Sequence, residues 1–410
     1  MRTYQELFRT REFTPLFLVS TGQVAAQTVS GLALSTLVYA ATGSPLLAAV
    51  AMFGPSLAQV VGATTLLSAA DRLPPRAALA AVALLFALGT AVLAVPGLPM
   101  WAVFVILPAQ GLVASLGGGV RYGLLHEILP KGGFLLGRSV LNMATGTMQI
   151  CGFAAGGLLL AALSPRGVLL GGAALYLAAA AAALTGLRPR PPRAGGRPSA
   201  AETWRTNVLL WSARPRRYVY LALWVPNGLI VGCESLFVPY APEHAGLLLA
   251  AAACGMLAGD TMAGRFVPPW WRERAGAALR LLLAAPYLLF ALRPGLPLAA
   301  AVVAVASVGY AASLLLQERL MALTPDELSG HALGLHSSGM LACQGLGAAL
   351  AGAVAQHTSP GTAMAVMAAV SVAVTLALAP GLRPGSDGRD GPDGAVTAAA
   401  PDSASRRRVP

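Results

Sequence analysis

The chain has 410 residues, of which 56% are hydrophobic and 11% are charged, and its formal net charge is +12. Soluble domains carry about twice this share of charged residues, so the composition excludes an ordinary soluble protein. The basic charge does not indicate a nucleic-acid partner. All 28 Lys and Arg residues except Arg166 and Arg293 lie at every second gap between long apolar stretches.

Twelve apolar stretches follow one another along the chain, each about 17–27 residues long, which is the length that a helix needs to cross a bilayer. We therefore expect the chain to be surrounded by a lipid bilayer. Stretches separated by only a few residues must form helical hairpins. In chain order, the predicted spans are 14–40, 45–68, 76–95, 99–120, 138–163, 167–187, 216–240, 245–266, 277–293, 296–317, 331–356 and 360–382.

The alternation of basic and neutral gaps predicts the orientation of the spans. Short segments rich in Lys and Arg stay on the cytoplasmic side of a membrane, so both termini and the run from Arg188 to Arg217 are expected there. The dominance of Arg over Lys, with abundant Ala, is typical of a GC-rich bacterial genome. We therefore expect a bacterial cell membrane. The charged amino-terminal end has no cleavable pattern before its first span, so no signal peptide is expected.

The chain divides into two halves joined by a linker. Six spans lie within 1–187 and six within 216–382. The linker, 188–215, begins with a Pro- and Arg-rich run that favours an exposed cytoplasmic segment. The tail, 383–410, has little to bury and is expected to be disordered and cytoplasmic.

The two halves also repeat each other in sequence. Ser164-Pro165 and Ser359-Pro360 occupy equivalent positions, and Gln149 and Gln344 are related by the same offset. A parallel duplication of six helices is typical of secondary transporters. The predicted fold is an all-α integral membrane fold with twelve transmembrane helices in two pseudo-symmetric six-helix bundles.

Polar residues in spans one, four, seven and ten recur at helical spacing and define one face of each span. Polar groups in a membrane usually face a bundle interior or a watery cavity, so we expect a central cavity for a small-molecule substrate. Hydrogen bonding between helices is the alternative. The predicted cavity residues are Gln23, Gln27, Gln110, Tyr220, Trp224, Asn227 and Tyr310. These residues include no acidic side chain, and span seven contains only one. Apolar or cationic substrates are therefore favoured over polyanions.

Glu234 is the one acidic residue of span seven. A carboxylate inside a membrane costs about 3 kcal/mol on insertion scales, and taking up a proton removes that charge. A group that gains and loses a proton as a cavity opens is what proton-coupled transport requires. We predict Glu234 to be the proton- or cation-coupling site. The alternative is a carboxylate wetted by a permanent outer vestibule.

Acidic and basic residues recur at the cytoplasmic ends of spans two and eight. Asp71 and Arg72 stand at the first position, and Asp260 and Arg265 at the second. Such charges can pair with helix ends in one conformational state and separate in another, so we predict that they gate the inner end. A solvated loop is the alternative for each pair taken alone.

The loop from Ser68 to Arg76, with Asp71 and Arg72 at its centre, resembles the Gly-x-x-x-Asp-Arg-x-Gly-Arg motif of the major facilitator superfamily. The leading Gly is absent, and Pro74 stands where the motif has its second Gly. The resemblance covers roughly residues 10–382. It implies a secondary transporter that alternates between inward-open and outward-open states.

Span five contains the sequence Gly-Phe-Ala-Ala-Gly-Gly, which resembles the Gly-Pro-x-x-Gly-Gly motif of antiporters in that family, with Phe153 in place of Pro. The segment Pro325–Leu328 is similar to the drug and siderophore exporter branch. This branch implies proton-coupled export of a drug-like or secondary-metabolite compound. Five glycines are expected to permit close helix packing: Gly152, Gly156, Gly157, Gly347 and Gly352.

Other functions stay open at this point. An importer or facilitator of a small solute would have the same fold, whereas a transporter-like sensor or scaffold would need a signalling module. A membrane-embedded enzyme would need clustered catalytic groups, and none are evident. We expect a monomer with no enzymatic activity, no cofactor and no metal. The four cysteines lack metal-like spacing: Cys151, Cys233, Cys254 and Cys343.

Overall fold

The computed structural model describes residues 4–65, 73–129, 133–192, 200–265, 269–325 and 328–382. Throughout these ranges the chain forms helices and connecting turns, and no strand. Eleven helical segments of the described chain are long and apolar enough to cross a membrane. The all-α membrane fold predicted from the sequence is therefore confirmed. The predicted tail, 383–410, lies outside the described residues.

The first half begins with a short helix and continues with six long ones. Three of them start at a proline, whose fixed φ and missing N–H suit the first helical turn. Gly43, with a φ of 63°, ends the second helix and lets the chain reverse. The helices are α1 (Tyr4–Arg9), α2 (Phe13–Thr42), α3 (Pro45–Thr65), α5 (Pro75–Leu93), α6 (Met100–Ile128), α7 (Phe134–Ala162) and α8 (Pro165–Gly186).

The linker and the second half contain the remaining helices, several of them interrupted by 3₁₀ turns. They are α9 (Ala200–Ser212), α10 (Arg214–Ser235), α11 (Phe237–Tyr240), α12 (Ala245–Arg265), α13 (Pro269–Ala284), η1 (Ala285–Leu292), α14 (Leu296–Val308), η2 (Gly309–Ala311), α15 (Ala312–Ala322), α16 (Ser329–His357), α17 (Pro360–Leu378) and η4 (Pro380–Leu382). Pro226 lies inside α10 without ending it.

The ninth predicted span, 277–293, has an unusual local structure. Its apolar part, Gly276–Leu292, is shorter than the other eleven segments. Its second portion is the 3₁₀ helix η1, in which Pro286 lies near the start. A 3₁₀ helix rises about 2.0 Å per residue against about 1.5 Å in an α-helix. This span therefore reaches across the bilayer with fewer residues.

The internal repeat is visible in how two equivalent helices start. Ser164 caps α8 by accepting a hydrogen bond from the backbone N–H of Gly167 at 3.2 Å. Ser359 caps α17 in the same way, accepting from Thr362 N–H at 3.2 Å. In both cases proline follows as the first helical residue. The repeated Ser-Pro pair therefore specifies the same N-cap in each half.

The start of the linker is held against the first half by ion pairs. Glu12, just before α2, is buried and lies 2.6 Å from Arg190 Nη1 and 3.3 Å from Arg188 Nε. Arg190 also lies 3.5 Å from Glu127 at the end of α6. One guanidinium thus joins the ends of spans one and four to the segment that follows span six.

Replacing Arg190 with Gln should lower the free energy of unfolding of the chain by about 1–3 kcal/mol, because it leaves the buried Glu12 carboxylate with a weaker partner. Arg188→Gln is the matched control, since 65% of the Arg188 side chain is exposed and exposed pairs contribute about 0–1 kcal/mol. Unfolding of each purified variant in mild detergent measures the two free energies of unfolding. Equal losses for the two variants would contradict this account.

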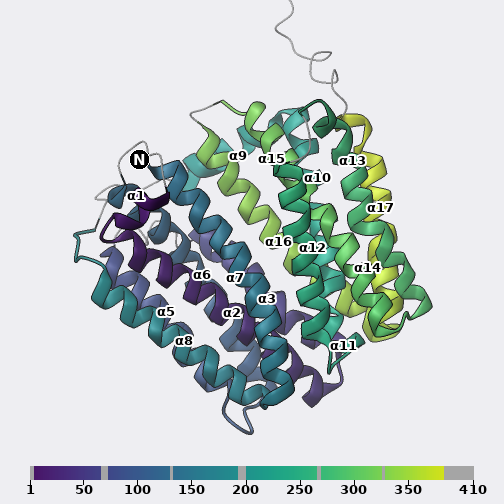
Figure 1. Ribbon diagram of the computed structural model, residues 1–410, viewed down its shortest axis with the longest axis horizontal. Helices are drawn as coiled ribbons and strands as arrows, with labels where there is room; N and C mark the ends of the chain where they lie inside the picture. Colours follow the sequence, from purple (N-terminus) through teal and green to yellow (C-terminus); the bar gives the residue numbers. More distant parts are fainter. Residues whose placement is uncertain are drawn as a thin grey trace, which may run out of the picture.

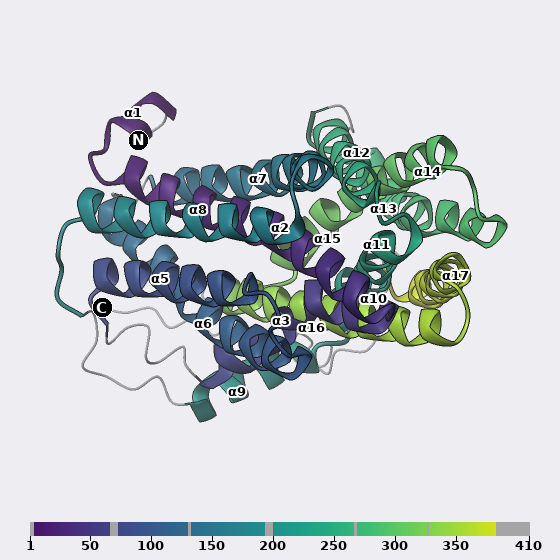
Figure 2. The same ribbon diagram turned by 90° about the horizontal axis from the view of Figure 1, so that it is seen from below.

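The linker also contains a helix that the sequence analysis did not predict. In α9, Leu210 is buried while Trp204 on another face is exposed. Trp211 stacks on Trp224 of α10, with ring centroids 5.6 Å apart and an interplanar angle of 10°. Arg216 donates a hydrogen bond to the carbonyl of Leu209 at 3.1 Å. α9 is therefore fixed to span seven. Figure 2 shows α1 at the upper edge and α9 at the lower edge of the view, both in its left half.

The two halves meet along two pairs of helices. Figure 1 shows α3 and α7 of the first half beside α16 and α12 of the second. The main contacts between halves are α3 with α16 and α7 with α12. These are spans two, eleven, five and eight, so symmetry-related helices build both contacts.

The halves pack together most closely at one end, which we call the short-loop end because the turns 43–44, 163–164, 241–244 and 358–359 lie there. Ser44 Oγ donates to Gln356 Oε1 at 2.8 Å across the two halves. One apolar core there combines Leu32 of α2 with Leu229 to Phe237 of the second half. At the opposite end, which carries α1 and α9, each half has a separate core. The structure is thus closed at the short-loop end.

Candidate functional site

Glu234 lies in the shared core at the closed end. Only 7% of this residue is exposed, and its Oε1 accepts a hydrogen bond from Tyr310 Oη at 3.0 Å. Its neighbour Cys233 belongs to the core that includes Leu32 of the first half. The short helix α11, one residue beyond α10, contacts α2 and α3. The carboxyl group therefore lies in the core through which the two halves make contact at this end.

Local backbone structure positions Tyr310 for this contact. It occupies the 3₁₀ turn η2 in the middle of span ten. A Cβ on the preceding Gly309 would lie 2.4 Å from Leu283 N in α13, so only glycine permits this close approach. Mid-helix 3₁₀ turns often mark hinges. The Glu234 partner therefore sits on the irregular section of its span, with Tyr287 Oη a further buried hydroxyl in the same core.

If Glu234 is the coupling site predicted from the sequence, Tyr310→Phe should shift the pH dependence of transport without abolishing it, because it removes the hydrogen bond that the Glu234 carboxyl accepts and leaves the carboxyl in place. The expected shift of the transport pH midpoint is about one pH unit, equivalent to about 1.4 kcal/mol. Transport rates measured across a pH series on either side of the midpoint test this. An unchanged midpoint would show that the Tyr310 hydroxyl does not act on Glu234.

The polar face of α10 contacts α16. Tyr220 Oη donates to the carbonyl of Ala332 at 3.4 Å, and Trp224 Nε1 donates to the carbonyl of His336 at 3.1 Å. Asn227 Oδ1 accepts from Gln344 Nε2 at 3.2 Å. Of the two interpretations of this polar stripe, the structure shows hydrogen bonding between helices for these three residues.

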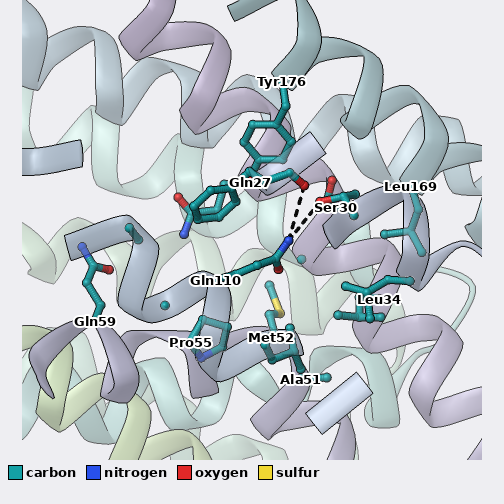
Figure 3. A pocket seen from close by; sticks show the side chains of 17 residues that line it. Gln27, Ser30, Leu34, Ala51, Met52, Pro55, Gln59, Gln110, Leu169 and Tyr176 are labelled. Carbon is teal, nitrogen blue, oxygen red and sulfur yellow. Dashed lines mark hydrogen bonds between the residues drawn. The ribbon is translucent and has the colours of Figure 1, made fainter. Parts of the chain in front are cut away.

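A cavity of about 50 Å³ lies inside the first half, among α2, α3, α5, α6 and α8. Figure 3 shows the Gln110 amide pointing into it, near Gln27, Ser30 and Met52. Gln110 Nε2 donates to the carbonyl of Phe86 and to Thr90 Oγ1, both at 3.4 Å. Gln27 is exposed and Ser30 is buried, so the cavity runs from an accessible mouth into the bundle.

Close packing of small residues shapes this cavity. A Cβ on Gly111 would lie 2.2 Å from the Pro55 carbonyl oxygen, which brings α6 against α3. A Cβ on Gly89 would lie 2.7 Å from Gln110 Nε2. Glycine at position 89 therefore leaves the space that the Gln110 amide occupies.

The structure groups the predicted cavity residues differently from the sequence analysis. Gln27 and Gln110 line the cavity of the first half, and Gln23 lies one helical turn before Gln27 but is not part of the lining. Glu234 and Tyr310 form a separate pair in the second half. None of the residues lining the cavity comes from the second half.

Sequence reasoning missed most of the cavity lining, including an amide and a phenol. Gln59 lies on α3 and Tyr176 on α8, and both line the cavity. Gln59 is the one amide in predicted span 45–68, so the rule that polar residues in spans face an interior would have found it. Tyr176 shows no such signal, because it is isolated in an apolar helix.

The predicted gate residues are only partly described. Asp71 and Arg72 lie outside the described residues. Asp260 is exposed on α12 near the end that carries α9. Arg265 is the last residue of α12, and its side chain lies outside the described part of the structure.

The five predicted packing glycines lie at close helix contacts of two kinds. Gly152 and Gly156 face α2, and Gly347 faces the Gly228 carbonyl of α10, so these three pack within one half. Gly157 faces Gly246, and Gly352 faces Leu46, so these two pack between halves. A Cβ on Gly157 would lie 2.6 Å from the Gly246 Cα.

Comparison with protein families matches residues 16–316 to the Major Facilitator Superfamily. The chain belongs to this superfamily. It is therefore a multi-pass membrane protein and a secondary transporter, and not an enzyme. A comparison with curated protein sequences found no significant match.

Solved structures of transporters share the fold at low sequence identity. A bacterial homologue of the human lysosomal transporter Spinster, inward-facing and unoccupied, has a TM-score of 0.70 at 12% identity, covering 92% of this chain and 96% of that one. The nucleoside transporter NupG has a TM-score of 0.67 at 14% identity, covering 91% and 99%. A POT family transporter in complex with 5-aminolevulinic acid has a TM-score of 0.70 at 12% identity, covering 91% and 97%. These likenesses support the fold and leave the substrate open.

Proposed function

We propose that this major facilitator is a proton-coupled exporter of a small drug-like or secondary-metabolite compound, and that Glu234 is its proton-coupling site. The observation that carries the proposal is the burial of this acid in the core that closes the short-loop end. Opening that end would wet the carboxyl and favour its charged form. Closing it would favour the protonated form, because burying an unpaired charge is costly.

The basic residues of the connections support an orientation. Under the positive-inside rule the end with α1 and α9 faces the cytoplasm, so the described state is inward-facing. We place the chain in a bacterial cell membrane as a monomer. Protons would enter through the short-loop end when it opens, and the substrate would leave there; the proton would then be released to the cytoplasm in the inward-facing state, before the next substrate binds.

Export is supported by the glycines of span five, which resemble the antiporter motif. In the structure Gly152 and Gly156 pack against α2. The inner gate would include Asp260 and Arg265 together with Asp71 and Arg72. Substrate would reach Gln27 and Gln110 from the cytoplasmic side.

Two experiments test this function in order. A bacterial host lacking its own exporters, grown with and without the chain across a compound panel, identifies a compound to which the chain gives resistance. Purified chain in vesicles with an acidic interior should then accumulate that compound against its gradient. Accumulation that ignores the pH gradient would remove proton coupling, and uptake that raises sensitivity in the host would indicate an importer.

A further inference from the structure

The cavity of the first half contains polar groups without protein partners. Ser30 is only 8% exposed, and its Oγ is buried with no hydrogen bond to the described residues. Gln27, Gln59 and Tyr176 also line the cavity; no hydrogen bond from their side chains to another described residue is seen. Buried polar groups in proteins are nearly always hydrogen-bonded, so the buried hydroxyls of Ser30 and Tyr176 call for a ligand or water.

The same lining carries no formal charge. Its seventeen residues include no Asp, Glu, Lys, Arg or His. An ion that entered would give up its hydration without meeting an opposite charge, which is strongly unfavourable. Amides and hydroxyls offer both donors and acceptors. The cavity therefore matches a group that is uncharged and forms hydrogen bonds in both directions.

Apolar side chains limit the size and shape of that group. Phe86 and Tyr176 flank the cavity with ring centroids 5.1 Å apart and an interplanar angle of 39°. A cavity of about 50 Å³ has room for a few water molecules. It therefore takes one polar end of a ligand and leaves the remainder at the mouth beside Gln27.

We propose that this cavity is a subsite for an uncharged hydrogen-bonding group of the substrate, such as a primary amide, and that Gln110 is its main determinant. The inference rests on the proposed function only in taking the ligand to be the transported compound. It revises the expectation of a cationic substrate, because Glu234, the one acid of span seven, lies in the other half and not at this cavity.

Three probes of nearly equal shape test the charge preference: benzamide is neutral, benzamidinium is a cation and benzoate is an anion. Binding of each to the purified full chain is measured by thermal unfolding over a concentration series up to tens of millimolar. Benzamide should stabilise the chain, and each ion should bind at least about tenfold more weakly. Equal or tighter binding of either ion, or no effect of benzamide, would overturn the proposal.

Two substitutions at one position separate recognition from folding. Gln110→Met keeps the side-chain length and should weaken benzamide at least about tenfold, because it removes the amide. Gln110→Glu should gain binding of benzamidinium, a result that a merely unstable variant would not give. Gln149→Met is the matched control, since Gln149 is exposed on α7 and does not line the cavity. Benzamide binding that survives Gln110→Met unchanged would contradict the assignment.

This binding assay needs neither a pH gradient nor transport. If vesicle transport proves independent of pH while the charge preference holds, proton coupling is wrong and the subsite stands. If transport follows the pH gradient and the three probes bind alike, the subsite is wrong and the coupling stands.

Discussion

Glu234→Gln is expected to reduce accumulation driven by a pH gradient to the level measured without a gradient, a fall of at least about tenfold. Glutamine keeps the size and can still accept the hydrogen bond that Tyr310 donates at 3.0 Å, so the packing of the short-loop end should survive. What is lost is the ability to carry a charge in one state and a proton in the other. A tenfold fall in accumulation corresponds to about 1.4 kcal/mol. This energy is smaller than the cost of placing an unpaired charge in a membrane.

The matched control for this variant is Glu243→Gln. Glu243 lies in the exposed turn at the same end of the molecule, so it experiences the same pH without being buried. The Glu243→Gln variant should transport the compound as the unmodified chain does. Normal gradient-driven accumulation by Glu234→Gln would show that another group couples protons to transport.

Gly157→Leu should have the second largest effect, reducing transport at least about fivefold while both halves stay folded. A side chain there meets the backbone of Gly246 in the other half, with its Cβ 2.6 Å from the Cα. Backbone cannot move aside as a flexible side chain can, so the halves must separate. Overpacking of this kind costs about 1–3 kcal/mol, which is enough to depopulate the closed short-loop end by about fivefold or more.

Gly146→Leu on the same helix is the matched control, because a Cβ at Gly146 meets no atom within 4 Å. A disulfide introduced between Ser44→Cys and Gln356→Cys reports closure of the short-loop end, since those two side chains now form a hydrogen bond across the halves. Cross-linking should fall in Gly157→Leu and persist in Gly146→Leu. Full cross-linking in both would mean that the helices accommodate the added side chain.

Much of the fold was predictable because its signals are local. Bilayer thickness sets the length of a span, and the predicted hairpins needed only short gaps between apolar stretches. The repeated Ser-Pro pair at Ser164 and Ser359 specifies the same cap in both halves. The ninth span was predicted from apolar character, whereas its 3₁₀ section around Pro286 depends on packing against α17.

The candidate site was less predictable because helical spacing shows which residues share one face of a helix. It does not show which other helix, or which cavity, that face meets. Tyr220, Trp224 and Asn227 share one face of α10, and that face contacts α16. A cavity and a helix contact both favour polar residues there, so the sequence leaves the choice open. Tyr176 joins Gln110 at the cavity only through the packing of α5 between α6 and α8.

The central claim is that protonation of Glu234 controls opening of the short-loop end. The most direct measurement is the distance between spin labels at Ser44 and Gln356, in a chain without its native cysteines, at acidic and alkaline pH. A single short distance should dominate at acidic pH, when the buried carboxyl is neutral, and a longer one should appear at alkaline pH. Glu234→Gln should hold the short distance at both. A pH-dependent opening that persists in Glu234→Gln, or none in the unmodified chain, would contradict the account.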